Sequence, residues 1–197
     1  MRTIIIGNSG SGKTWLASRL SDASGGSVVH LDDLFWEPGG FDKKRPQETV
    51  ALMIKEAKAK DSWIAEGVFG ELAEQFFDWA HVLIWLDVDW PTCHARLLKR
   101  GSESKKHMGR VESEEGLKNL VEWASKYYER TSTRSFLGHE RLLEIFSGQK
   151  VRLRSEEEVL RMAEMPNQTL QRDLARWGSF MFTLITLLSS CFLPLGS

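Results

Sequence analysis

The chain has 197 residues, of which 42% are hydrophobic and 27% are charged. The length suits one domain, which we take to be followed by a tail, and the composition is that of a globular protein and not of an intrinsically disordered chain. The 26 basic and 27 acidic residues nearly cancel, so a broad electropositive face is not expected and nucleic acid is a disfavoured, though not excluded, partner.

The cysteines and the first residues indicate where the protein works. Cys93 and Cys191 lie far apart and form no CxxC pair, which argues against a disulfide framework or a zinc site and favours a reducing compartment. The apolar part of "MRTIIIG" is too short for a signal peptide. His30 and His81 lie at the edges of apolar runs, so they are expected to be structural. We therefore predict a cytoplasmic protein.

Short β-branched runs alternate with helix-like stretches along the chain, which predicts an α/β fold with a parallel sheet flanked by helices. The expected strands are Thr3 to Ile6, Ser27 to Leu31, Trp63 to Ala65, Val82 to Asp87 and Lys150 to Leu153. The expected helices are Lys13 to Leu20, Pro46 to Lys60, Pro91 to Arg100, and a last one opened by the capping box Ser155 to Glu158. The stretch from Glu114 to Phe146 is expected to be mostly helical, with Gly138 as a break.

The segment "GNSGSGKT" meets the pattern G-x-x-x-x-G-K-[ST] between an expected strand and an expected helix. In a chain of this length a chance match is on the order of one in a hundred. Backbone N–H groups of such a loop surround phosphates, while Lys13 is expected on the outer phosphates of ATP and the Thr14 hydroxyl on Mg²⁺. The predicted nucleotide-binding residues are Gly7, Asn8, Ser9, Gly10, Ser11, Gly12, Lys13 and Thr14.

Acidic residues at three strand ends are candidates for the chemistry, because ligands of open α/β sheets bind beyond the carboxyl ends of the strands. Phosphoryl transfer needs one carboxylate near Mg²⁺ and one that orients or deprotonates the acceptor. Asp32 is the preferred acceptor carboxylate and Glu66 the preferred metal-side carboxylate, with Asp33 open as a replacement. Adjacent Asp32 and Asp33 would face opposite ways in a continuing strand. Asp87 and Asp89 are expected to be structural.

Together, "GNSGSGKT", "HLDDLFWEPGG", "DSWIAEGVF", "VLIWLDV", "RLLKR" and "VRLRS" resemble a bacterial group of adenylate-kinase-like P-loop kinases, often labelled DNA topology modulation protein. The resemblance runs from Arg2 to about Met165. It implies a P-loop NTPase fold of the kinase type, with five parallel strands in the order 2-3-1-4-5. It also implies that Asp32 and Trp36 border the acceptor, that Glu66 and Gly67 lie beside Mg²⁺ and the phosphates, and that a closing lid is flanked or formed by Arg96, Arg100 and Arg110. Trp15 departs from this group, where a smaller or aliphatic residue is usual.

The lid is also expected from the residues themselves. Arg96 and Arg100 share one face of a predicted helix, and "GSESKKHMGR" after them contains glycine and has no apolar periodicity. Arginines on a closing segment neutralise the charge of a transferred phosphoryl group. We therefore predict a lid near residues 101–116 in which Arg100 and Arg110 act on phosphates, within a domain spanning residues 1–165. A solvated loop is the alternative.

The tail, residues 166–197, lies beyond the end of the resemblance. From Trp177 to the end it has no charged residue, and Arg172 and Arg176 precede it. A helix from Trp177 to Leu195 would reach roughly 28 Å, about the thickness of a hydrocarbon core. Its strongly apolar part, Phe180 to Leu193, is shorter than a span needs. Membrane attachment, association with a partner or with a second copy of the chain, and no function at all stay open.

The leading hypothesis is a kinase that transfers the γ-phosphoryl group of ATP, with Mg²⁺, to a small acceptor such as a nucleotide or a hydroxyl metabolite. The predicted catalytic residues are Lys13, Asp32, Glu66, Arg100 and Arg110, and the predicted metal ligands are Thr14 and Glu66. The main alternative is a nucleotide-dependent regulator that hydrolyses ATP slowly and acts on DNA topology or on a protein partner. A third hypothesis is a membrane-associated interaction protein that keeps the loop only for stability.

Overall fold

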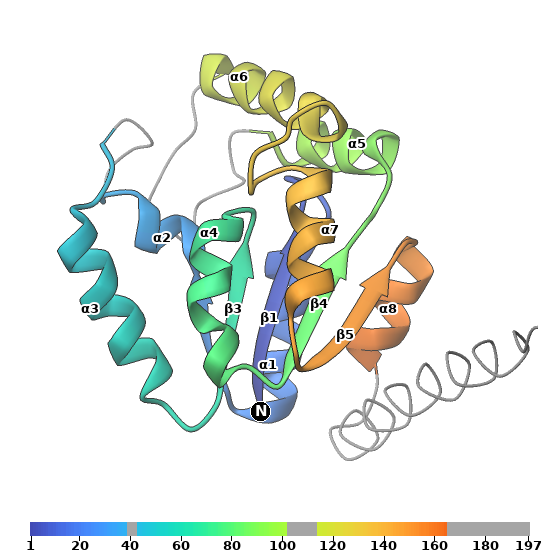
Figure 1. The fold of residues 1–197 in the computed structure, drawn as a ribbon. Coiled ribbons are helices and arrows are strands. Elements are labelled where there is room, and N and C mark those ends of the chain that lie inside the picture. The colour runs from blue at the N-terminus through green and yellow to red at the C-terminus, as the bar shows by residue number, and fades with distance from the viewer. Residues whose placement is uncertain (39–42, 102–113, 165–197) are drawn as a thin grey trace, which may run out of the picture.

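A five-stranded sheet lies between two layers of helices in the computed structural model, which describes residues 1–38, 43–101 and 114–164 (Figure 1). All neighbouring strands pair in parallel, in the order β2-β3-β1-β4-β5. This confirms the predicted kinase-type sheet, and each predicted strand is found with its ends within two residues of the predicted ones. The strands are β1 (Arg2–Gly7), β2 (Ser27–His30), β3 (Trp63–Gly67), β4 (Val82–Leu86) and β5 (Gln149–Leu153).

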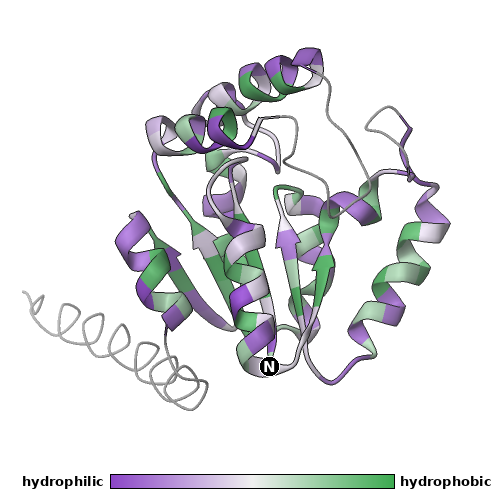
Figure 2. Cartoon of the chain, turned by 180° about the vertical axis from the view of Figure 1, so that it is seen from behind, coloured by the Kyte–Doolittle hydropathy of each residue, from purple (hydrophilic) through white to green (hydrophobic). Residues whose placement is uncertain are grey.

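Each face of the sheet has its own apolar core, because successive side chains of a strand point to opposite faces. In β1, Ile4 and Ile6 belong to one core and Ile5 to the other, and all three are fully buried. The strands are coloured mostly as hydrophobic, whereas the helices carry both colours (Figure 2). The first core is covered by α3 (Gln47–Lys58), α4 (Gly70–Ala73) and α7 (Phe136–Ile145), and the second by α1 (Lys13–Ser24) and α8 (Glu156–Glu164).

The expected capping box at the start of α8 is present in part. The Glu158 N–H donates to Ser155 Oγ at 3.2 Å, as expected. The Glu158 carboxylate accepts from the Arg154 N–H at 2.6 Å, one residue before the one predicted. The structure also contains short helices that the sequence did not indicate, α2 (Leu31–Phe35) and the 3₁₀ helix η1 (Glu74–Trp79).

The predicted break at Gly138 is wrong. The stretch divides into α6 (Glu114–Ser125), the 3₁₀ helix η3 (Lys126–Tyr128) and α7, and Gly138 lies in the first turn of α7. Ser135 begins that helix, because its Oγ accepts from the Gly138 N–H at 3.1 Å. A Cβ at Gly138 would lie 2.3 Å from the Ser132 carbonyl oxygen. Glycine at position 138 therefore allows close packing against residue 132, and it does not end a helix.

Two predicted segments lie mainly or wholly outside the described residues. Of the lid near 101–116, residues 102–113, including Arg110, are outside, and Glu114 onward forms α6. The tail 166–197, with its predicted membrane or self-association, is outside as well. Within the three described ranges, every helix is too short or too polar to cross a membrane.

Candidate active site

The phosphate loop joins β1 to α1, and two of its positions require glycine for steric reasons. Gly10 and Gly12 have φ values of 82° and 101°, which side-chain-bearing residues rarely adopt. A Cβ at Gly10 would also lie 2.4 Å from the Cys93 carbonyl oxygen on α5 (Trp90–Arg100). Gly12 caps α1 without a side-chain hydrogen bond, so the helix presents its first backbone N–H groups to an anion.

Asn8 and Lys13 organise the inside of the loop. The Lys13 Nζ donates to the Asn8 carbonyl oxygen at 2.8 Å, and the Ser9 N–H donates to Asn8 Oδ1 at 2.8 Å. The Asn8 Nδ2 donates to the Ala124 carbonyl oxygen on α6 at 3.0 Å, so the loop is tied to that helix. Burial lowers the pKa of Lys13, while the charges of Glu66 and Asp32 act the other way. A bound phosphate would offset this burial by favouring the charged lysine.

Glu66, at the end of β3, joins the loop to β2. Its side chain is nearly buried, and its Oε1 accepts from the Thr14 hydroxyl at 3.0 Å and lies 2.7 Å from His30 Nδ1. Burial alone would raise the pKa of Glu66, but the hydrogen bond from His30 and the charge of Lys13 outweigh it and lower the pKa. Burial alone would lower the pKa of His30, but the hydrogen bond and charge of Glu66 raise it. This contact of His30 with Glu66 could not be predicted from the sequence.

Thr14 and Glu66 fit the predicted Mg²⁺. A hydroxyl and a carboxylate are hard oxygen donors, and Mg²⁺ at phosphate sites takes one or two protein oxygens beside phosphates and waters. Their oxygens lie 3.0 Å apart at the phosphate loop. In the part of the chain that the structure describes, no three His, Cys, Asp or Glu side chains gather as a metal cluster.

Two cavities meet at the phosphate loop. One, of about 470 Å³, lies among α2, the end of β3 and α6, and the other, of about 650 Å³, lies among α1, α5 and α8. Gly10, Thr14 and Arg100 line both. The loop therefore has a separate compartment on each side of it.

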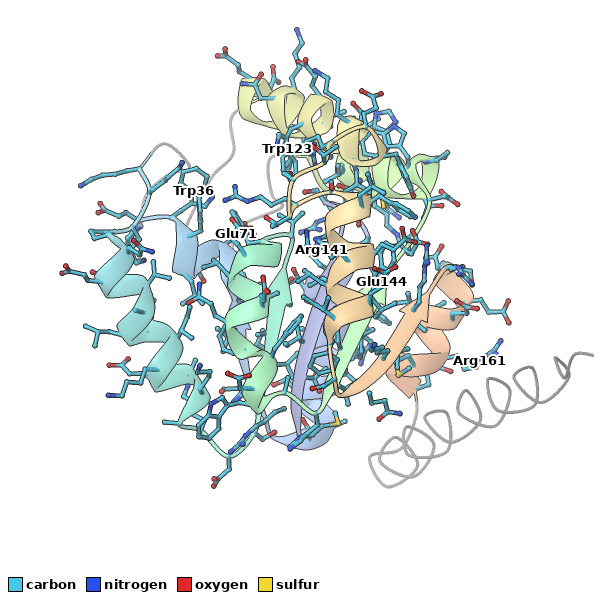
Figure 3. All side chains as sticks on the ribbon, viewed as in Figure 1. Trp36, Glu71, Trp123, Arg141, Glu144 and Arg161 are labelled. Atoms are coloured by element: carbon cyan, nitrogen blue, oxygen red, sulfur yellow. The ribbon has the colours of Figure 1, made fainter. Side chains whose placement is uncertain are left out.

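The first cavity has aromatic walls. Trp36 at the end of α2, Phe69 after β3 and Trp123 on α6 line it, and Figure 3 labels Trp36 and Trp123 at the end of the molecule where α6 lies. Asp32 and Lys13 also line it. The first cavity therefore combines flat apolar walls with charged groups at the phosphate loop.

The strand does not continue through Asp32 and Asp33, so the opposite-facing arrangement that a continuing strand would produce does not occur. β2 ends at His30, and both residues lie in the first turn of α2. A helical step of roughly 100° separates neighbouring side chains. Asp32 borders the first cavity, and the structure does not place Asp33 among its lining residues.

Arg134 lines the first cavity but was not foreseen from the sequence. Its Nε donates to Glu71 Oε1 at 2.7 Å, and its guanidinium carbon lies 4.3 Å from the ring centres of both Phe35 and Phe69. Burial alone would raise the pKa of Glu71, but the hydrogen bonds from Arg134 and Thr133 lower it. Arg134 follows η3 in an irregular segment without any motif, so only the tertiary contacts identify it.

The arginines of α5 reach the loop from its other side. Arg96 Nη1 donates to the Ser11 carbonyl oxygen at 3.0 Å, and its Nη2 lies 2.9 Å from Glu156 Oε1 on α8. Arg96 therefore connects the phosphate loop to α8. Arg100, in contrast, borders both cavities.

Asp87 and Asp89 have structural contacts. Asp89 caps α5 by accepting from the Thr92 N–H at 2.7 Å, and Asp87 pairs with Arg152 at 2.9 Å.

A buried chain of hydrogen bonds supports the wall of the first cavity. The Trp85 Nε1 donates to the Tyr127 hydroxyl at 3.2 Å, and the Tyr127 hydroxyl lies 2.6 Å from His139 Nδ1. The His139 Nε2 lies 3.1 Å from the carbonyl oxygen of Val68, a lining residue. Every member is satisfied if neutral His139 carries its proton on Nε2.

We expect acid to destabilise the fold through His139. Burial lowers the pKa of His139 to about 3, so the unfolded chain binds a proton below pH 6.5 that the folded chain does not. The contribution of neutral His139 to the free energy of unfolding is complete above pH 6.5 and is lost as the pH falls towards 3. Between pH 7 and pH 5 the loss is about 2 kcal/mol. Urea unfolding of the wild type and of His139→Gln at both pH values measures this loss. His30 has a raised pKa, so its contribution to stability changes with pH in the opposite direction. That contribution is the same in both proteins and cancels when they are compared. An equal loss of stability in the wild type and in His139→Gln would contradict the role of His139.

Neither a family model nor a curated protein matches this sequence. Among solved structures, the chain is similar to a gluconokinase from Sinorhizobium meliloti 1021 (13% identity, 93% of this chain and 96% of the other, TM-score 0.47). It is also similar to a sugar kinase from Janibacter sp. HTCC2649 (15%, 88% and 92%, TM-score 0.44) and to deoxyadenosine kinase from M. mycoides with bound dATP (16%, 90% and 100%, TM-score 0.38). At this level of sequence identity and TM-score, the activities of these proteins cannot be assigned to this chain. The strand order and the glycine loop between β1 and α1 give this chain the fold of the P-loop NTPases.

Proposed function

We propose that this protein is a kinase that transfers the γ-phosphoryl group of ATP to a small acceptor. The observation that carries the proposal is the meeting of two cavities at Gly10, Thr14 and Arg100. A hydrolase needs a nucleotide site and water, whereas a transferase needs a second compartment that opens onto the transferred group. Both cavities have volumes within the range of small-molecule sites.

The second cavity suits the nucleotide donor. It lies against the first turn of α1, where the loop presents backbone N–H groups. Trp15, 41% exposed, and Leu160, 42% exposed, line it beside Ser18 and Lys99. An indole and an apolar side chain can stack on a base while the phosphates extend into the loop. Trp15, the departure from the resembled group, is thus a wall of the proposed base site.

The first cavity suits the acceptor, and the charged groups have distinct roles in the transfer. Lys13 would exchange its bond to the Asn8 carbonyl oxygen for one to the outer phosphates, and Arg100 would neutralise the phosphoryl group in transfer. Asp32 would accept the proton of the attacking hydroxyl. Mg²⁺ held by Thr14 and Glu66 would supply charge neutralisation at the phosphates. Arg110, the cytoplasmic location and association through residues 166–197 stay predictions from the sequence.

Acceptor-dependent turnover tests the proposal. With ATP and Mg²⁺, we expect the purified protein to form ADP much faster when a panel of nucleosides, nucleotides and small alcohols contains its acceptor. The phosphorylated product should appear in equal amount. Slow ADP formation that no acceptor changes would instead support the nucleotide-dependent regulator, and no nucleotide turnover at all would leave the loop with a structural role.

A further inference from the structure

We infer that the acceptor is a nucleoside, a neutral compound with a planar base and a free sugar hydroxyl; this inference rests on the proposed transfer reaction. Three aromatic side chains of the described residues, Trp36, Phe69 and Trp123, line the first cavity together with the charged groups at the phosphate loop. Aromatic rings bind the flat face of a base, and such stacking is a large part of base recognition.

The aromatic walls are held in place before any ligand binds. The Arg130 guanidinium carbon lies 3.8 Å from the ring centre of Trp123, and its Nη2 donates to the Arg134 carbonyl oxygen at 2.9 Å. Phe35 stacks on Phe69 with ring centres 4.5 Å apart, and Arg134 lies 4.3 Å from both rings. A rigid ring loses little conformational freedom on binding, so these walls favour a flat ligand over a flexible one.

The charges argue against an acceptor that already carries a phosphate. Within the described residues, the cations on the wall are Lys13, Arg100 and Arg134. Lys13 and Arg100 border the phosphate loop, where the donor phosphates are proposed, and Arg134 forms an ion pair with Glu71. The carboxylate of Asp32 also lines the cavity and would repel a second dianion. A neutral hydroxyl acceptor suits this balance, because a carboxylate can take its proton.

The lining also argues against a polyol. Beyond the phosphate loop, the polar side chains of this wall in the described part of the chain are those of Asp32, Glu66, Arg100, Asn119 and Arg134. Glu66 and Arg100 are assigned to Mg²⁺ and to the phosphoryl group in transfer, which leaves three polar side chains for the rest of the acceptor. A polyol would place most of its hydroxyls against tryptophan, phenylalanine, valine and leucine, where buried hydroxyls without partners are costly. A nucleoside presents a π face there, and the Asn119 amide can both donate to and accept from the edge of its base.

The transfer balances with these groups alone. The sugar hydroxyl oxygen forms a bond to the γ-phosphorus of ATP while the bond from that phosphorus to the ADP oxygen breaks. The hydroxyl proton passes to the Asp32 carboxylate, and the products are ADP and a nucleoside monophosphate.

The experiment compares three acceptor classes with the full chain, ATP and Mg²⁺: adenosine, guanosine, cytidine and thymidine; AMP and CMP; and ribitol and gluconate. We expect at least one nucleoside to have a kcat/KM at least about tenfold above every monophosphate and polyol. Trp123→Leu and Trp36→Leu should raise the KM for that nucleoside by about tenfold. Trp79→Leu, an exposed tryptophan on η1 outside both cavities, should leave it unchanged.

Binding of the same compounds, measured by calorimetry with a non-hydrolysable ATP analogue, separates the two proposals. Nucleosides that bind to the wild type, and more weakly to Trp123→Leu, support the nucleoside inference. If such nucleosides bind but are not phosphorylated, the proposed kinase activity is wrong and the inference about the ligand class still holds. Transfer to a polyol or a monophosphate at equal or higher kcat/KM overturns the nucleoside inference and leaves the kinase standing. Nucleosides that neither bind nor react also overturn it.

Discussion

In the Lys13→Ala variant, we expect kcat for phosphoryl transfer to fall about 100–1000-fold, the loss typical of removing one strong donor from a transition-state site. The Lys13 ammonium is nearly buried beside Glu66 and Asp32, and its present partner is a loop carbonyl oxygen. A phosphate oxygen competes well with that carbonyl, because hydrogen bonds between charged groups are the stronger kind. Binding of ATP should also weaken by about 1.5–3 kcal/mol. Steady-state kinetics and calorimetry measure the two losses.

Stability serves as the control for Lys13. Because burial lowers the pKa of Lys13, its charge opposes folding, so its removal should not lower the urea midpoint below that of the wild type. Lys55→Ala changes an exposed lysine on α3 and should alter neither kcat nor the midpoint. A folded Lys13→Ala protein with wild-type turnover would exclude Lys13 as the main phosphate-binding side chain.

For Asp32→Asn, we expect kcat to fall about 100–10,000-fold, the range for loss of a general base, while the Kd for ATP changes only a few fold. The substitution keeps the size of the side chain and removes the charge that would take the acceptor proton. Asp32 lines the first cavity and not the proposed donor cavity. Kinetics against the true acceptor, beside ATP binding by calorimetry, separate these two effects.

The neighbouring residue gives the matched control. Asp33→Asn makes the same chemical change in the same turn of α2, at a position that the structure does not place on the wall of either cavity. It should retain wild-type kcat. If Asp33→Asn instead loses turnover and Asp32→Asn keeps it, the assignment of the two aspartates is reversed.

Local patterns in the sequence were sufficient to predict the strands and the phosphate loop. The loop depends on glycines at fixed spacing, since Gly10 and Gly12 adopt positive φ values. The strands depend on continuous apolar runs such as Val82–Leu86, which is buried throughout. Gly138 was misread because a glycine that ends a helix and a glycine that allows close packing look alike in sequence; the carbonyl oxygen of Ser132, 2.3 Å from its would-be Cβ, is what distinguishes them.

The sequence by itself thus determined a parallel α/β sheet and placed Lys13 and Thr14 at one end of it, because these features follow from periodicity and from contacts between near neighbours. Only the tertiary structure decided which side chains share a cavity with them. Arg134 and Trp123 lie more than a hundred residues from the loop and border the same cavity as Lys13. It also decided that His30 contacts Glu66 across two strands, and that Asp32 rather than Asp33 lines the cavity. Such contacts depend on how helices pack over the sheet, which no local pattern encodes.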